Sequence, residues 1–229
     1  MQIKVLSWNI WIDNHFEKID GFLKSTDAEI ISLQEVLPND PKRDVVSLLK
    51  KLGYNRVFWP FKHSWGTKVF NDAPAIFTKF EILKTEKIVL SKKDSRIAVR
   101  ADIKVGDKTL HVFCTHLIHT HQGPSKVQEE QVQALIKNLP SENTIIMGDF
   151  NATPESSTIK SMKKVLTDTD PSSKPTWSMY EAGCKVCYPG GVKIRLDYIF
   201  TSKDLKTSSF KVENSNGSDH LPISVILEL

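Results

Sequence analysis

The sequence has no apolar run long enough to form a membrane-spanning helix, and its N-terminus lacks the basic, apolar and small-residue segments of a secretory signal. A spanning helix needs about 20 apolar residues in a row, whereas the apolar runs here have the length of strands. No stretch rich in proline, glycine and serine divides the 229 residues. These absences predict a single domain over residues 1–229, without a transmembrane segment and in a cytoplasmic location.

Cysteine is also scarce. The chain has three cysteines, and this small, odd number argues against a disulfide framework. Cys184 and Cys187 have the spacing of a metal-binding or redox pair, but no second cysteine pair completes a tetrahedral zinc site. His119 and His121 lie in a polar stretch with Thr120, which favours a solvated turn over a metal cluster made of these histidines. A zinc or redox role for the cysteine pair is therefore the less favoured alternative.

The composition is that of an ordinary soluble globular protein, with 40% hydrophobic and 25% charged residues. A net charge of +4 mildly favours polyanionic partners such as nucleic acid or anionic lipid headgroups. Residues 62–70 are predicted to be a loop in which His63, Trp65 and Phe70 accompany two lysines. Such a mixture can stack on a base or lie at a lipid interface, and the alternative is an aromatic core beneath a long loop.

The most informative stretch is residues 144–151, where an apolar run ends abruptly in polar residues. Residues 145–147 are apolar without alternation, which is typical of a strand covered on both faces. Gly148 permits a close approach of the backbone to another segment. Asp149 and Asn151 then bring a carboxylate and an amide to the end of this strand, where chemistry on an anion is common.

Other polar residues also stand at or near the ends of apolar strands. They are Asn9, Glu35, His116, Asp197, Asp219 and His220. Each has an ordinary explanation when taken singly, such as a turn amide or a surface carboxylate, and their joint occurrence is the signal. Arg96 opens a further strand, where it is either a phosphate contact or a solvated strand end.

Helical and strand patterns alternate along the chain. Consecutive strand patterns from residue 74 to residue 116, without helices between them, require a mainly antiparallel part of the sheet system. Thr153, Pro154 and Glu155 predict the start of a helix, and Asn14 is a possible cap of an earlier one. Apolar residues at helical spacing predict further helices over 14–26, 41–52 and 125–139. The chain is therefore predicted to have an α/β fold.

Six short motifs follow one another between residues 7 and 222. They are Ser-Trp-Asn9, Leu-Gln-Glu35, Thr-His116-Leu, Gly-Asp149-Phe-Asn151, Arg-Leu-Asp197-Tyr-Ile and Ser-Asp219-His220-Leu-Pro. In this order they resemble the motifs of the endonuclease/exonuclease/phosphatase superfamily. The resemblance implies a four-layered α/β/β/α sandwich with two mixed, mainly antiparallel sheets. It also implies a phosphoesterase site that depends on Mg²⁺, with Mn²⁺ as a possible substitute.

The resemblance implies roles for the oxygen ligands first. Glu35 would hold the metal together with Asn9, and Asp219 would add a direct or water-mediated contact. Asp149 would position or deprotonate the attacking water, and Asn151 would orient that water and touch the phosphate. These residue types suit the chemistry independently, because a hard cation held by oxygen ligands neutralises an anionic phosphodiester and acts as a Lewis acid.

The histidines receive roles from the same resemblance. Asp197 would bond one ring nitrogen of His220, which fixes the tautomer and favours an imidazolium that binds phosphate oxygens. His116 would stabilise the transition state or protonate the leaving oxygen. A histidine held by a carboxylate can serve such roles near neutral pH.

The substrate is predicted from departures from the family pattern. The first part of the helix predicted over 125–139, from Ser125 to Gln131, lacks an arginine that many relatives have shortly before the matching glutamine. His116 argues against the usual abasic-site endonuclease. Nucleic acid is the leading substrate, cleaved by a nuclease or a DNA-end-processing enzyme. A phospholipid, sphingomyelin, inositol-phosphate or other small phosphoester hydrolase is the alternative, and a non-catalytic nucleic-acid-binding relative is remote because no motif residue is missing. No obligate protein partner is evident.

Overall fold

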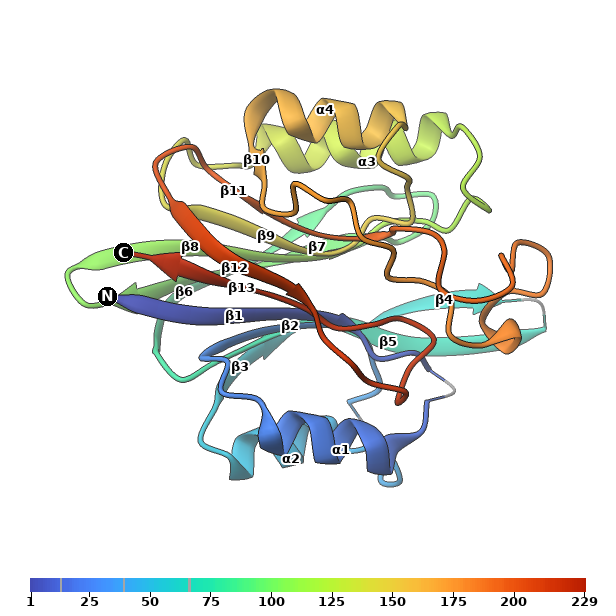
Figure 1. The fold of residues 1–229 in the computed structure, drawn as a ribbon, viewed down its shortest axis with the longest axis horizontal. Helices are drawn as coiled ribbons and strands as arrows, with labels where there is room; N and C mark the ends of the chain where they lie inside the picture. Colours follow the sequence, from blue (N-terminus) through green and yellow to red (C-terminus); the bar gives the residue numbers. More distant parts are fainter. Residues whose placement is uncertain (13, 39, 66) are drawn as a thin grey trace.

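The computed structural model describes residues 1–12, 14–38, 40–65 and 67–229, and it has four layers (Figure 1). Over these residues the helices lie outside and two sheets lie face to face between them. The helices are α1 (Phe16–Ser25), α2 (Val45–Lys51), α3 (Lys126–Lys137) and α4 (Ser157–Val165). Helices α1 and α2 cover one sheet, and α3 and α4 cover the other. The predicted α/β/β/α sandwich is confirmed.

The first sheet contains the N-terminal and C-terminal strands side by side. In spatial order it consists of β12 (Lys206–Val212), β13 (Ile223–Glu228), β1 (Gln2–Asn9), β2 (Ile30–Val36), β5 (Lys68–Thr78) and β3 (Asn55–Phe58), and β4 (Phe61–Trp65) pairs with β5. Strands β1 and β2 are parallel, and the neighbouring pairs are antiparallel. The sheet is therefore mixed and mainly antiparallel, as predicted.

The second sheet has the same character. Its order is β10 (Thr167–Asp168), β11 (Asp197–Thr201), β9 (Thr144–Asp149), β8 (Lys108–His116), β7 (Ile97–Val105) and β6 (Glu81–Val89). Only β8 and β9 are parallel among the described pairs of this sheet. The run of strands from β5 to β8 explains why the sequence shows no helix between residues 74 and 116.

Three apolar clusters hold the layers together. The largest lies between the sheets and includes Val5, Ile76, Val112 and Met147. A second cluster joins α1 and α2 to the first sheet, and a third joins α3 and α4 to the second sheet. Strands buried on both faces account for the unbroken apolar run at residues 145–147, all of which are fully buried.

Two helix starts differ from the sequence prediction. The N-cap of α1 is His15, which makes no side-chain cap hydrogen bond, so Asn14 is not the cap. Helix α4 begins after Ser156, whose side chain accepts a hydrogen bond from the amide of Ile159, and not at Thr153 and Pro154. Serine satisfies an otherwise unpaired N–H of the first turn, so the favourable cap lies three residues after the predicted one.

The predicted loop at residues 62–70 is wrong. Strand β4 and the first part of β5 pair antiparallel, with Phe61 opposite Asp72. The side chains of residues 63–65 and 68 lie outside the described part of the structure, and with them the predicted roles of His63 and Trp65. Phe70 is described and lines the pocket presented below.

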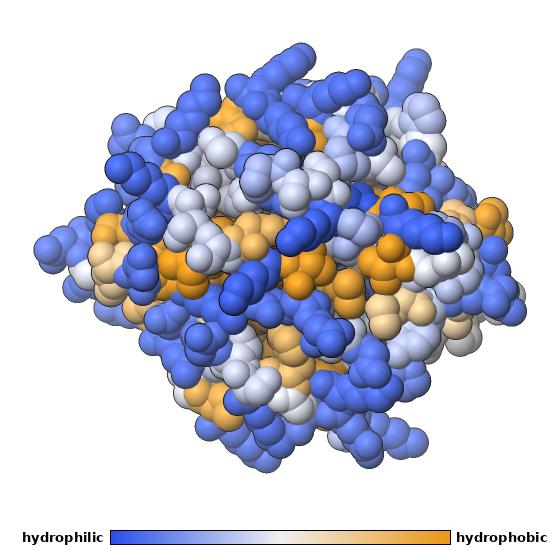
Figure 2. Space-filling view, in the orientation of Figure 1, coloured by the Kyte–Doolittle hydropathy of each residue, from blue (hydrophilic) through white to orange (hydrophobic). Residues whose placement is uncertain are grey.

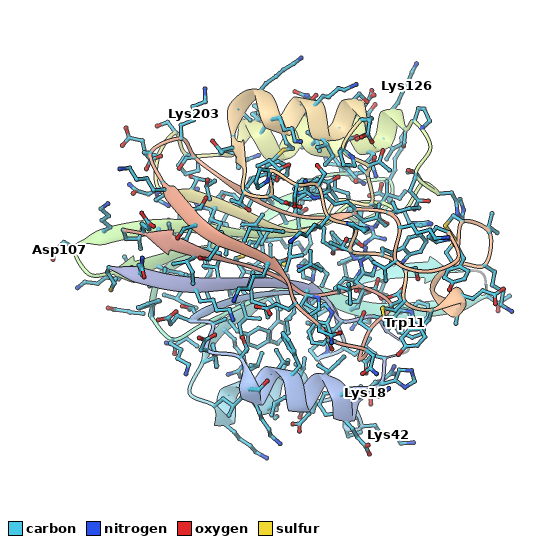
Figure 3. The ribbon with its side chains drawn as sticks, in the orientation of Figure 1. Trp11, Lys18, Lys42, Asp107, Lys126 and Lys203 are labelled. Atoms are coloured by element: carbon cyan, nitrogen blue, oxygen red, sulfur yellow. A yellow bond between two sulfur atoms is a disulfide. The ribbon has the colours of Figure 1, made fainter. Side chains whose placement is uncertain are left out.

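The surface is mostly hydrophilic on the face shown in Figure 2, with hydrophobic side chains gathered along the middle, where the strands lie. Lysines project from both outer sides, among them Lys18 and Lys42 on one and Lys126 and Lys203 on the other (Figure 3). The two chain ends lie at one end of the sandwich and Trp11 at the opposite end. In the described part of the chain, no helix has the length and apolar character that crossing a membrane requires.

Candidate active site

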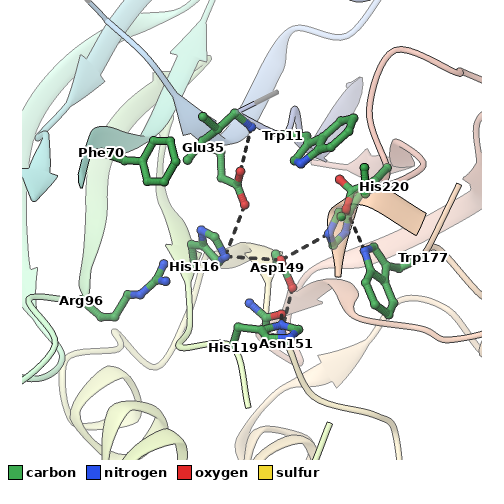
Figure 4. Close-up of a pocket in the computed structure, with 14 residues that line it drawn as sticks. Trp11, Glu35, Phe70, Arg96, His116, His119, Asp149, Asn151, Trp177 and His220 are labelled. Atoms are coloured by element: carbon green, nitrogen blue, oxygen red, sulfur yellow. Dashed lines mark hydrogen bonds and ion pairs between the residues drawn. The ribbon is translucent and has the colours of Figure 1, made fainter. Parts of the chain in front are cut away.

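The predicted site residues come together at the end of the sandwich that is opposite the chain termini. In the first sheet, parallel β1 and β2 deliver Asn9 and Glu35 to this end. In the second sheet, parallel β8 and β9 end at His116 and Asp149, which are register partners. Asp197 pairs with Asp149 from the other side, at the start of β11. Strand geometry thus places groups from distant parts of the chain at one pocket (Figure 4).

The pocket has an aromatic rim and a charged interior (Figure 4). Phe70 and Arg96 lie on one side, and Trp11 and Trp177 lie on the other. The residues that line it are Trp11, Ile12, Glu35, Phe70, Arg96, His116, His119, Asp149, Asn151, Trp177, Ala182, Gly183, Asp219 and His220.

Asn9 holds two carboxylates together. Its Nδ2 donates to Oε1 of Glu35 and to Oδ2 of Asp149, both at 3.0 Å. Its Oδ1 accepts from the amide of Trp11 at 3.0 Å, and the amide of Ile12 donates to Oε2 of Glu35 at 2.8 Å. Asn9 therefore presents its nitrogen to the carboxylates in this structure, whereas a ligand role would use its oxygen. Glu35 is the better supported cation ligand of the two.

His116 faces the same carboxylates. Its Nε2 lies 3.4 Å from Oδ2 of Asp149 and 4.0 Å from Oε1 of Glu35. The side chain is almost fully buried at the end of β8. An imidazole in this position can exchange a proton with a group bound between the two carboxylates.

Asp197 and His220 form a buried pair beside Asp149. Nδ1 of His220 lies 2.9 Å from Oδ2 of Asp197, and the hydroxyl of Thr176 donates to the same oxygen at 2.6 Å. Nε2 of His220 lies 3.7 Å from Oδ2 of Asp149. Burial alone would lower the pKa of His220, but Asp197, Asp219 and Asp149 raise that pKa well above its usual value. The geometry therefore favours an imidazolium that is directed toward the pocket.

Asp219 is held by an aromatic side chain. Nε1 of Trp177 donates to Oδ2 of Asp219 at 2.9 Å. Gly183 packs against the same carboxylate so closely that a Cβ at this position would overlap Oδ2. Burial raises the pKa of Asp219, while the charge of His220 and the bond from Trp177 oppose that increase.

Asn151 is fixed by partners on three sides. Its Nδ2 donates to the carbonyl of Leu117 at 3.0 Å, and its backbone amide donates to Oδ1 of Asp149 at 2.8 Å. Nδ1 of His119 lies 2.8 Å from Oδ1 of Asn151. His119 therefore belongs to the pocket, which corrects the prediction of a solvated turn at this residue. His121 is exposed.

Arg96 is buried, with an exposed fraction of 6%, which makes the solvated-strand-end alternative wrong. Its guanidinium lies 5.3 Å from the centre of the Phe61 ring, and it points toward His116 and Asn151 (Figure 4). Within the described residues, Nη1 of Arg96 has no hydrogen-bond partner. A buried guanidinium with an unmet N–H in a pocket is suited to a phosphate oxygen.

Three pocket residues have a strained backbone conformation. Trp11, Glu35 and Asn151 have positive φ angles of 56°, 60° and 50°, a region that residues other than glycine seldom adopt. Such conformations persist where surrounding contacts over-determine them, and they are frequent at active sites. The hydrogen bonds of Glu35 and Asn151 described above provide those contacts.

The carboxylates fit an oxygen-liganded cation. Burial raises the pKa of Glu35 to about 6, and Asp72 and Asp219 add to the shift by repulsion. Burial also raises the pKa of Asp149. Within the described part of the chain, the ion pairs of Glu35 and Asp149 are with histidines and not with lysine or arginine. A divalent cation would neutralise this cluster, and its oxygen donors are those that Mg²⁺ prefers.

A second grouping of potential metal ligands lies in the same pocket. One ligand atom each from Asp149, Asp197 and His220 lies within 4.8 Å of the others. Asp197 and His220 are already bonded to each other, so Asp149 is the member that most readily serves a cation. The pocket thus offers Asp149 in addition to the predicted ligands Glu35 and Asp219.

Some pocket residues lie outside the motifs recognised in the sequence. Trp11, Trp177 and Gly183 line the pocket, and Thr176 supports Asp197. Trp11 follows Asn9 by two residues and was therefore close to a recognised motif. Residues 176–183 lie in a stretch without regular periodicity, and long loops of this kind are often functional.

The fold and this pocket define a phosphoester hydrolase. A sequence model of the endonuclease/exonuclease/phosphatase family matches residues 6–220, and the chain belongs to this family. Its members hydrolyse phosphoester bonds and typically depend on a divalent metal. No match was found among curated proteins.

Solved structures share the fold at low sequence identity. The human Nocturnin catalytic domain with bound sulfate is 22% identical, with a TM-score of 0.78, and the match covers 99% of this chain and 93% of that one. ANGEL2, a 2′,3′-cyclic phosphatase in complex with adenosine-2′,3′-vanadate, is 16% identical, with a TM-score of 0.79 and coverage of 99% and 95%. A family protein from Bacteroides vulgatus is 20% identical, with a TM-score of 0.79 and coverage of 100% and 99%.

Proposed function

We propose that this protein hydrolyses phosphodiester bonds in nucleic acid by metal-assisted attack of water. The observation that carries the proposal is the buried guanidinium of Arg96, whose Nη1 lacks a partner among the described residues and which faces a pocket of carboxylates and histidines. Arginine binds phosphate oxygens through charged, directional hydrogen bonds. An anionic substrate would therefore place its phosphate between Arg96 and the carboxylate cluster.

The side chains divide the work on such a substrate. Glu35, with Asp149 and Asp219, would hold Mg²⁺ or Mn²⁺, which when bound supplies charge neutralisation and Lewis acidity. Asp149 would accept the proton of the attacking water, since burial raises its pKa and so makes the carboxylate a better base. The imidazolium of His220, held by Asp197, would bind a phosphate oxygen.

Two further groups complete the assignment. Asn151 would orient the water or touch the phosphate from its fixed position. His116 would stabilise the transition state or protonate the leaving oxygen. Removal of a positioned proton donor costs about 10²- to 10⁴-fold in rate, which is the scale expected for His116→Ala.

The aromatic rim supports nucleic acid as the substrate class. Trp11 stacks on Tyr180 with ring centroids 5.8 Å apart and an interplanar angle of 16°, and Trp11 also lines the pocket. Stacking of a base on an exposed aromatic ring contributes about 1–3 kcal/mol per base. The ANGEL2 structure contains an adenosine derivative, so one member of this fold accommodates a nucleoside next to a phosphate-like group.

A phospholipid or sphingomyelin hydrolase is the second candidate, and exposed apolar side chains favour it. Val69 on β5 has an exposed fraction of 69%, and Val186 in the loop after residue 183 has 84%. Each is close in sequence to a pocket residue, Phe70 or Gly183. Exposed apolar residues beside a pocket are typical of lipid contact, although single ones are common on any surface.

Product analysis on a substrate panel tests the proposal. The panel contains single-stranded and duplex DNA, RNA, 5′-tyrosyl DNA, sphingomyelin and inositol phosphates, each with Mg²⁺ or with excess chelator. We expect metal-dependent cleavage of a nucleic acid substrate. Cleavage of sphingomyelin alone would contradict the proposal and support the second candidate.

A further inference from the structure

A second cluster of metal-binding side chains lies beside the pocket. His119 and His121 are in the loop between β8 and α3, and Cys184 and Cys187 follow the short 3-10 helix η1 (Glu181–Gly183). One ligand atom from each of the four residues lies within 4.8 Å of all the others. The pairs are more than 60 residues apart in the chain, since Cys184 and His121 are separated by 63 positions. Folding thus supplies the second ligand pair that the cysteines lack in the sequence.

Three of the separations between ligand atoms are those of a tetrahedral site. Nε2 of His119 lies 3.3 Å from Nδ1 of His121 and 3.4 Å from Sγ of Cys187, and Nδ1 of His121 lies 3.5 Å from Sγ of Cys184. In a tetrahedral zinc centre, bond lengths near 2.0 Å to nitrogen and 2.3 Å to sulfur separate two nitrogens by about 3.3 Å and a nitrogen from a sulfur by about 3.5 Å. These three separations agree with those edges, whereas the two sulfur atoms are bonded to each other here and have to separate before both can bind a metal.

The hydrogen bonds of His119 leave the correct nitrogen for a metal. Asn151 uses its Nδ2 to donate to Leu117, so its Oδ1 is the acceptor that faces His119. Nδ1 of His119 must therefore carry the proton, and in the neutral ring Nε2 is then the electron-pair donor. Histidine ligands of metals are typically held in this way by a hydrogen bond from the other ring nitrogen.

We propose that His119, His121, Cys184 and Cys187 form a structural zinc site, distinct from the oxygen-liganded catalytic site. Two thiolates and two imidazoles suit Zn²⁺ and not Mg²⁺, because sulfur is a soft ligand. All four positions are filled by the protein, which is typical of a structural centre. The site joins the 119–121 loop to the 184–187 loop, and these loops border the pocket through His119 and Gly183. Zinc would thereby hold His119, and with it the amide of Asn151.

The disulfide between Cys184 and Cys187 is the oxidised state of the same site. A dithiol reductant transfers two electrons and two protons to it, which yields two thiols while the reductant forms its own disulfide. Zn²⁺ then replaces the two thiol protons, which pass to solvent, because the thiolate is the ligand. The disulfide and the zinc centre are therefore alternative states that differ by a two-electron exchange.

Metal titration of the full chain tests the proposal. The protein is reduced with dithiothreitol, stripped with a chelator, freed of both under anaerobic conditions, and titrated with Co²⁺ or with Zn²⁺. We expect one equivalent of Co²⁺ to produce thiolate-to-cobalt charge-transfer bands and the intense visible bands of tetrahedral cobalt, and Zn²⁺ to remove both. One equivalent of Zn²⁺ should also protect two thiols from a disulfide reagent. Absence of the bands, or thiols that stay reactive in saturating zinc, would overturn the proposal.

Variants locate the site. Cys187→Ser and His121→Ala should each weaken binding of Co²⁺ by roughly 100-fold or more, because every ligand contributes to the metal affinity. Lys185→Ala is the matched control, since Lys185 lies between the two cysteines and is exposed. The affinity of this variant for Co²⁺ should be unchanged. Equal affinity in all three variants would place the metal elsewhere and contradict the proposal. The cobalt spectra and the thiol protection are measured on the unsubstituted chain, so they test the site even if a variant fails to fold. They also do not require that the protein hydrolyses nucleic acid.

Discussion

Asp197 and His220 show how one buried carboxylate can prepare a histidine for work on an anion. The carboxylate is completely buried, and its Oδ2 receives bonds from Thr176 and His220 at 2.6 Å and 2.9 Å. A charge in such a position needs a charged partner, which the imidazolium provides. His220 is thereby fixed in orientation while its other nitrogen faces Asp149.

Asp197→Asn should lower both the pKa of His220 and the turnover. An amide retains the shape but removes the charge that favours the imidazolium, so we expect kcat to fall by about 10²- to 10⁴-fold. The alkaline limb of the pH–rate profile should also move to lower pH. Steady-state kinetics from pH 5 to 9 measure both effects. Asp107→Asn is the control, because Asp107 lies at the far end of the molecule (Figure 3) and should leave the profile unchanged.

Arg96→Lys should weaken phosphate binding although it keeps the charge. The ammonium group cannot form the two parallel bonds of a guanidinium, and we expect the inhibition constant of inorganic phosphate to rise about tenfold, or about 1.4 kcal/mol. Competition kinetics measure it. Arg56→Lys provides the comparison, since Arg56 is exposed on β3. An unchanged constant in Arg96→Lys would show that the phosphate binds elsewhere.

At the scale of the elements, parallel strands β8 and β9 deliver His116 and Asp149 side by side. Gly148 makes this possible, because a Cβ there would overlap the backbone carbonyl of Thr115. The sequence predicts a close backbone approach at this glycine, and the segment that it approaches is the neighbouring strand β8.

Gly148→Ala should destabilise the fold by about 1–3 kcal/mol or more, since the added methyl group meets backbone that cannot move without disturbing the sheet. Urea denaturation followed by fluorescence measures the change. Gly21→Ala is the matched control: Gly21 is in α1 with no heavy atom within 4 Å of the added Cβ, and the exchange should stabilise by about 0.5–1 kcal/mol. Equal stabilities of wild type and Gly148→Ala would refute this account of the strand contact.

Asp168 ties the short strand β10 to the segment before β11. Its carboxylate binds the guanidinium of Arg195 at 2.7 Å and 2.9 Å, and Arg195 is 3% exposed. Burial alone would raise the pKa of Asp168, but the bonds from Arg195 and Lys163 lower it below its ordinary value. Asp168→Asn should therefore destabilise the fold by up to about 3 kcal/mol at neutral pH, because the buried guanidinium loses its closer carboxylate and keeps only Asp170, whose Oδ2 lies 3.7 Å from Nε.

The sign of the pH effect follows from the lowered pKa of Asp168. The stabilisation is complete above the ordinary pKa of about 4 and is lost as the pH falls through the lower pKa of the folded state. The difference in unfolding free energy between wild type and Asp168→Asn should thus be constant from pH 5 to 7 and shrink below pH 4. Asp20→Asn, which removes an exposed pair with Lys24, should change stability by less than about 1 kcal/mol.

At the scale of the whole molecule, the two sheets bring Glu35 and Asp149 together at one end of the sandwich. Burial in this cluster destabilises the ionised form of Glu35 and raises its pKa to about 6. Ionisation of Glu35 at neutral pH therefore opposes folding by about 2 kcal/mol in the metal-free protein. A bound cation would remove this cost.

Mg²⁺ or Mn²⁺ should raise the melting temperature of the protein at pH 7.5. At a metal concentration 100 times the dissociation constant, the stabilisation should be about 2.7 kcal/mol. A chelator should abolish both the stabilisation and the activity. The stabilisation should be smaller at pH 5, where Glu35 holds a proton that competes with the cation. Differential scanning calorimetry measures both. Glu35→Gln should lose the response, while Glu142→Gln, an exposed residue, should retain it. A full metal response in Glu35→Gln would remove this glutamate from the ligand set.

The strand-end motifs were accessible from the sequence because they depend on local order. An apolar strand pattern that ends at Asp149 or His116 indicates, from a few neighbouring residues, that the strand is buried and at which end the polar residue lies. Six such motifs in order indicated the family and the layered fold. The starts of α1 and α4 were less accessible, since several residues near each start can act as a cap. Arg96 was ambiguous because its burial depends on Phe61 and on the pocket, which are not neighbours in sequence.

The sequence by itself determined the class of fold and which polar residues stand at the ends of the strands, since hydrophobic periodicity and motif order are properties of short segments. Only the tertiary structure decided which of those residues touch. The bonds of Asn9 to both Glu35 and Asp149, and the approach of His119 and His121 to Cys184 and Cys187, join segments whose contact no local pattern encodes. The physical reason is that such contacts depend on how two sheets and their loops pack, which is a property of the whole chain.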